Sequence, residues 1–150
     1  MCGIVAVTGY KKALPLLING LEKLEYRGYD SAGVAIINSE TNSITCNKAE
    51  GKLKNLINNL NDKNIPGTVG IGHTRWATHG KPEFKNAHPH VDGSGTIAVV
   101  QNGIIENFQD LKNKLEKEGI IFNSDTDTEV IPHLIQRELN TLSKLNLENN

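Results

Sequence analysis

Apolar side chains recur along the chain at two spacings, and these predict both strands and helices. Short apolar-rich runs, bounded by Gly, Pro and Asn, are typical of strands. They occupy residues 2–7, 33–38, 43–48, 68–74 and 96–101. Apolar residues three and four positions apart predict amphipathic helices. That spacing occurs over about residues 11–25, 53–60, 108–115 and 130–139.

The last predicted helix also has a start signal and an end signal. Thr126 is followed three residues later by Glu129, the spacing of a capping box. We therefore expect that helix to begin near Thr126. Residues 140–150 are polar and lose the periodicity, so they are expected to fray.

Composition narrows the class of protein. A chain of 150 residues with 37% hydrophobic and 22% charged residues is typical of one globular domain. The net charge of -1 and the lack of a basic block argue against nucleic acid as a partner. No apolar run reaches the ~20 residues of a membrane-spanning helix, and no secretory signal begins the chain. Two cysteines do not form a disulfide framework, which favours a reducing, cytoplasmic compartment.

Cys2 is the first candidate for chemistry. If Met1 is removed, Cys2 carries a thiol and a free α-amine on one carbon, a nucleophile with its own base. The alternative is a small buried side chain at the start of a strand.

Three polar segments lie between the periodic elements and collect functional side chains. They are residues 26–33 (YRGYDSAG), 73–80 (HTRWATHG) and 86–90 (NAHPH). Arg75, in the second segment, can bind a carboxylate with two parallel hydrogen bonds.

Two further motifs follow later strands. Asn102-Gly103 favours a hairpin turn, although a side-chain amide and a backbone N–H there could also stabilise an oxyanion. Asp125 and Asp127 precede the last helix, where carboxylates cap helices or bind an ammonium group.

The histidines raise a metal site as an alternative. Four of the five fall between residues 73 and 90, at positions 73, 79, 88 and 90. No HExxH or CxxC spacing accompanies them, so we expect no metal and no other cofactor.

Taken together and in order, these segments resemble the glutaminase domain of the glutamine–fructose-6-phosphate aminotransferase family, also called glucosamine-6-phosphate synthases. The resemblance covers residues 2–139 and leaves residues 140–150 as a tail. It rests on CGI at 2–4, the three polar segments, QNGIIEN at 101–107 and SDTDTEV at 124–130. It implies an α+β fold, the αββα sandwich of N-terminal-nucleophile hydrolases.

The resemblance also implies an activity and its residues. Cys2 would attack the side-chain amide of glutamine and form a thioester, releasing ammonia, with Asn102 and Gly103 as the oxyanion hole. The remaining roles are glutamine binding by Arg75, Thr78, His79 and Asp127, and gating or lid contacts by Trp76 and Arg27.

In that family, ammonia passes to fructose 6-phosphate in a sugar isomerase module, which nothing here resembles. The sandwich is also expected to be incomplete at its C-terminal side, so a complementing chain or a homodimer is a candidate partner. Two alternatives stay open: a fragment that binds glutamine without turnover, and a histidine metalloenzyme.

Overall fold

The computed structural model describes residues 1–28, 30–61, 63–76 and 81–148, and its centre is an antiparallel four-stranded sheet. The strand order is β1-β4-β2-β3. The strands are β1 (Gly3–Val7), β2 (Ser31–Asn38), β3 (Ser43–Glu50) and β4 (Gly70–Arg75). Because β4 runs antiparallel to β1, its last residues lie beside the N-terminus of the chain. The register pairs Gly3 with Thr74, and His73 with both Ile4 and Gly33.

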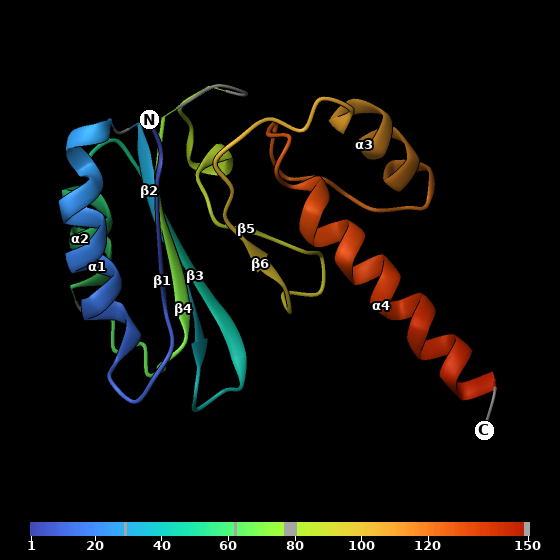
Figure 1. Cartoon of the computed structure of the whole chain (residues 1–150), viewed down its shortest axis with the longest axis horizontal. Helices are drawn as coiled ribbons and strands as arrows, with labels where there is room; N and C mark the ends of the chain where they lie inside the picture. The colour runs from blue at the N-terminus through green and yellow to red at the C-terminus, as the bar shows by residue number, and fades with distance from the viewer. Residues whose placement is uncertain (29, 62, 77–80, 149–150) are drawn as a thin grey trace.

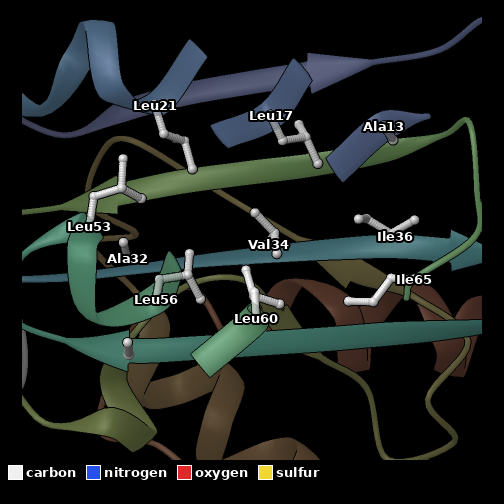
Figure 2. Packing of buried hydrophobic residues seen from close by; sticks show 11 residues of the cluster. Ala13, Leu17, Leu21, Ala32, Val34, Ile36, Leu53, Leu56, Leu60 and Ile65 are labelled. Carbon is white, nitrogen blue, oxygen red and sulfur yellow. The ribbon is translucent and has the colours of Figure 1, made fainter. Parts of the chain in front are cut away.

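Two amphipathic helices cover one face of this sheet. They are α1 (Ala13–Leu24) and α2 (Leu53–Leu60), and Figure 1 shows both on the same side. Their buried leucines, spaced three and four apart, meet the inward side chains of β2. Figure 2 shows this core, formed by Ala13, Leu17, Leu21, Ala32, Val34, Ile36, Ala49, Leu53, Leu56, Leu60 and Ile65. The core holds the sheet from one side and leaves the other side for the rest of the chain.

The opposite face carries the second half of the molecule. A short antiparallel pair, β5 (His90–Val91) and β6 (Ala98–Val99), lies beside the sheet, followed outward by α3 (Phe108–Lys117) and α4 (Val130–Glu148) (Figure 1). Two single 3-10 turns, Glu25–Arg27 and Phe84–Asn86, complete the elements of the described residues. The layers run helix, sheet, sheet, helix, with two strands described in the second sheet. The predicted α+β sandwich with an incomplete second layer is confirmed.

Strand and helix positions were predicted well in the first half of the chain and less well in the second. The predicted strand at 96–101 shrinks to Ala98–Val99, and β5 was not expected. Asn102-Gly103 does not make a hairpin, since the next described element is α3.

The predicted start of the last helix is wrong. The helix begins at Val130, and Thr126 does not cap it; its hydroxyl lies 2.9 Å from His90 Nε2. Glu129 instead accepts N–H bonds from Asn123 and Ser124 at 2.8 and 2.7 Å. The carboxylate therefore ties the preceding loop to the helix start.

Residues 140–148, expected from the sequence to lie beyond the last helix, form part of α4. The structure continues α4 without a break to Glu148. Bonds from side chains four residues apart support this extension, such as Gln136 Nε2 to Asn140 Oδ1 at 2.9 Å. In the described part of the chain, no helix combines the length and apolarity needed to cross a membrane.

Candidate active site

A cavity of about 470 Å³ opens where the start of β1 meets the end of β4. Seven of the nine site residues expected from the sequence line it. They are Cys2, Arg27, Arg75, Trp76, Asn102, Gly103 and Asp127. The other two, Thr78 and His79, lie outside the described residues. Side chains up to 125 positions apart in the sequence therefore converge on one space.

Cys2 immediately precedes β1, and its thiol contacts the residue that follows β4. The backbone N–H of Trp76 donates to Cys2 Sγ at 3.1 Å. This contact follows from the register of β1 with β4, which carries the chain from Thr74 beside Gly3 to Trp76 beside the thiol. A side chain at Gly3 would crowd Leu24 and Thr74, both 2.8 Å from an added Cβ. Glycine after Cys2 thus lets the nucleophile lie close to β4.

Asn102 approaches Cys2 from the second layer. Its Nδ2 donates to the Cys2 carbonyl at 3.2 Å, and its Oδ1 lies 2.8 Å from His73 Nε2. Gly103 follows, and a Cβ there would come within 3.0 Å of Gln101 Nε2. Cys2, Asn102 and Gly103 thus all line the cavity.

Arg75 is a buried cation in the cavity wall, 3% exposed. Its Nη1 lies 3.7 Å from Asp30 Oδ1 and donates to the Lys81 carbonyl at 3.2 Å. A buried guanidinium needs such partners, since burying a charge without compensation is costly. These contacts hold the guanidinium in place beside the cavity, where it can meet a carboxylate.

Asp127 and Asp125, two residues apart, have different surroundings. Asp127 is buried in the cavity wall, and its Oδ2 accepts the N–H of Ile105 at 2.7 Å. Asp125 faces outward, where it pairs with Lys85 at 2.8 Å. Asp127 is therefore the carboxylate that can contact a ligand in the cavity, opposite in charge to Arg75.

Trp76 and Arg27 lie at the rim of the cavity. Trp76 is half exposed and packs flat on Gly28, where any Cβ would overlap the indole ring. Arg27 contacts Met1 through its carbonyl, which accepts the terminal ammonium at 2.5 Å, and through Nη2, 3.7 Å from Met1 Sδ. Met1 therefore forms part of the cavity wall beside Cys2.

Three histidines form a buried stack, and two of them, His73 and His88, line the cavity. The rings of His73 and His88 lie 4.3 Å apart and nearly parallel, and His90 meets His88 edge-on at 4.6 Å. Burial lowers the pKa of His73 to about 4 and that of His90 to about 3, and it lowers the pKa of His88 as well. All three rings are neutral at pH 7.

This arrangement does not resemble a metal centre. Stacked rings present faces to one another, whereas metal ligands must point their nitrogens at one point. Within the residues that the structure describes, no group of three or more His, Cys, Asp or Glu side chains could hold a metal ion. His79, named in the metal alternative, lies outside them.

The sequence interpretation missed several residues in the cavity wall. Gln101, Thr126 and Thr128 line it, and so do His73 and His88, which were considered only in the metal alternative. His73 contacts Asn102. A signal for His73 was present: side chains two apart on a strand share a face, and His73 precedes Arg75 by two. Thr128 Oγ1 donates to Gln101 Oε1 at 2.8 Å, which links the segment before α4 to the segment after β6.

The chain was compared with known families and proteins, and both comparisons find relatives. A family model described as the glutamine amidotransferase domain matches residues 39–146. Among curated proteins, the glutamine–fructose-6-phosphate aminotransferase (isomerizing) of Gloeobacter violaceus is 59% identical over 90% of this chain. The enzyme of the same name from Pyrococcus horikoshii is 55% identical over 93%. The chain spans only 22% and 23% of the lengths of these two relatives.

Solved structures show the same fold. The glutamine phosphoribosylpyrophosphate amidotransferase of B. subtilis superposes with a TM-score of 0.74 at 31% identity, covering 91% of this chain and 29% of that one. A structure described as the allosteric regulatory enzyme of purine biosynthesis gives 0.77 at 31% identity, covering 91% and 30%.

Proposed function

The chain belongs to the glutamine amidotransferase domain family, and from this premise we propose that it hydrolyses the side-chain amide of glutamine to glutamate and ammonia. The observation that carries the proposal is the convergence of Cys2, Arg75, Asn102 and Asp127 on one cavity. A thiol and an amide donor are groups that cleave an amide, and a cation and an anion can bind the two charged ends of a free amino acid.

The chemistry begins with removal of Met1, which frees the α-amine of Cys2 and opens the cavity wall that Met1 occupies. The amine accepts the thiol proton as Cys2 Sγ attacks the amide carbon. Asn102 Nδ2 and the Gly103 N–H would stabilise the oxyanion. The C–N bond then breaks, ammonia leaves with the proton returned by the amine, and water hydrolyses the thioester to glutamate.

Substrate selection follows from charge. Arg75 would bind the α-carboxylate of glutamine and Asp127 the α-ammonium, and Thr78 and His79 would add further contacts to glutamine. A free amino acid carries both charges, whereas a glutamine within a peptide carries neither, so the pair selects free glutamine. Trp76 and Arg27, at the rim, would limit access of water to the thioester and guide the departing ammonia.

The wider role concerns a larger enzyme than this chain. We infer that residues 2–139 serve as a glutaminase unit whose ammonia converts fructose 6-phosphate to glucosamine 6-phosphate in a separate isomerase module. The names of the similar aminotransferases support this. Such a module, a complementing chain or a second copy would be the partner. A reducing cytoplasm would suit the free thiols of Cys2 and Cys46.

The test compares the two cysteines. Cys2→Ala should abolish glutamate release from L-glutamine. Cys46→Ala is the matched control, since Cys46 lies on β3 with Sγ near the Pro89 carbonyl, away from the cavity. Intact mass of the active sample should show Met1 absent.

Two results would contradict the proposal. Full activity of Cys2→Ala would exclude Cys2 as nucleophile. Glutamine binding by the wild-type chain, measured by calorimetry, without glutamate release after Met1 removal would favour the alternative of a binding fragment.

A further inference from the structure

His73 makes a contact that the proposed chemistry leaves unused. Its Nε2 lies 2.8 Å from Asn102 Oδ1, and the ring is 1% exposed. The other ring nitrogen, Nδ1, is buried and makes no hydrogen bond of normal geometry among the described residues, although the Gln101 backbone lies close enough to the ring to raise its pKa. A buried imidazole with one committed nitrogen has a defined orientation.

The contacts of Asn102 determine where the His73 proton resides. The Cys2 carbonyl can only accept, so the Asn102 atom 3.2 Å from it must be the NH2 group. The amide oxygen therefore faces His73, and an oxygen without a hydrogen needs a donor. His73 must be the Nε2–H tautomer, with Nδ1 unprotonated.

Neighbouring residues also hold the His73 ring in place, since His88 packs against one of its faces. His88 stacks on it at 4.3 Å, and the N–H of Gln101 is directed at His88 Nδ1 at 3.4 Å. Gly33 lies opposite His73 in the sheet and lets the His88 carbonyl pack on β2, where a Cβ would overlap it. Rotation of the Asn102 amide by 180° would place NH2 against the His73 N–H, an unfavourable pairing of donors.

We propose that His73 is a positioning residue that holds the Asn102 amide with its NH2 group facing Cys2, so that an oxyanion donor is in place before glutamine binds. This inference rests on the proposed function for its kinetic consequence, but the orientation itself does not. The chemistry is that of a preorganised donor, whose value comes from needing no rearrangement during the reaction. Burial supports the role, since it lowers the pKa of His73 to about 4 and keeps the ring neutral.

The first test measures orientation without catalysis. In the wild-type chain labelled with 15N-histidine, long-range 1H–15N spectra at pH 7 should show His73 as the Nε2–H tautomer, with His73→Gln identifying its signals. An Nδ1–H tautomer or a charged ring would overturn the proposal.

The second test is a double-mutant cycle on glutamate release. His73→Leu should lower kcat about 100-fold with little change in KM, since one oxyanion donor is worth about that factor. His73→Gln, whose amide nitrogen can reach the position of Nε2, should recover much of the loss. In an Asn102→Ala background, His73→Leu should cost less than threefold.

The outcomes separate the two proposals. Equal losses from His73→Leu with and without Asn102 would overturn positioning while leaving the glutaminase intact. A wild-type chain that lacks glutaminase activity while showing the Nε2–H tautomer would overturn the proposed function and support the orientation. Thermal unfolding of each variant distinguishes lost activity from lost fold.

Discussion

At the scale of single residues, the site depends on side chains held by partners other than the substrate. Arg75 is held by Asp30 and the Lys81 carbonyl, and Asn102 by His73. Such supports let a polar group keep its orientation in a buried wall, where an unpaired group would cost about 1–3 kcal/mol. The cavity is therefore arranged before glutamine arrives.

Arg75→Lys should mainly weaken glutamine binding. Lysine keeps the charge but loses the planar fork that pairs with a carboxylate through two bonds. We expect KM for glutamine to rise about tenfold, equivalent to about 1.4 kcal/mol, with a smaller change in kcat. Steady-state kinetics measures both. Arg137→Lys is the matched control, since Arg137 pairs with Glu118 and Glu138 at the surface. An unchanged KM in Arg75→Lys would contradict the carboxylate role.

At the scale of elements, strands with strong apolar patterns were predicted nearly to the residue, as for β1 at Gly3–Val7. The strands of the second layer were not predicted well. β5 and β6 have two residues each, too few to show the alternation of apolar and polar side chains that marks a strand. The start of α4 was misplaced because a carboxylate with capping-box spacing binds backbone N–H groups of the preceding loop instead. Local patterns cannot show which distant group completes a hydrogen bond.

The same limit applies to the site. Seven residues of the cavity wall were expected, but mainly through a family resemblance, since no local spacing links Cys2 to Asn102. His73 was named only in the metal alternative, which was not favoured, because the composition of a histidine-rich segment does not show what each ring contacts. Only the fold shows that His73 faces an amide and stacks on His88.

Gly33→Ala tests the close packing of the two layers. The added Cβ would overlap the His88 carbonyl and lie 3.1 Å from the Asn47 carbonyl, and both obstacles are backbone. We expect a loss of about 1–3 kcal/mol in the free energy of unfolding, the usual cost of overpacking. Urea unfolding at pH 7.5 measures it. Gly93→Ala is the control, since nothing lies within 4 Å of a Cβ there. Equal stabilities would show that the layers separate easily at this point.

At the scale of the whole molecule, the histidine stack lies between the two layers and connects the site to stability. His73 belongs to the first sheet, while His88 and His90 come from the segment that enters the second. The cations Arg75 and Lys48 add to burial in opposing protonation of His88. A proton on any of these rings would place a buried charge in the interface between layers, which Asp30 and Glu129 offset only in part for His73 and His90.

Stability should therefore fall as the pH drops below about 6.5. The unfolded chain binds protons at ordinary histidine pKa values, whereas the folded pKa of His73 is about 4 and those of His88 and His90 are lowered too. Lowered folded values stabilise the protein above pH 6.5, and that contribution is lost on acidification. Each such histidine contributes a slope of up to about 1.4 kcal/mol per pH unit. His88→Phe keeps a ring against His73 but cannot take a proton, so it should reduce the slope by about that amount. Urea unfolding of both proteins between pH 6 and 5, above the range of ordinary carboxylates, measures the difference. Equal slopes would show that His88 is not neutral in the folded chain and that the interface tolerates its charge.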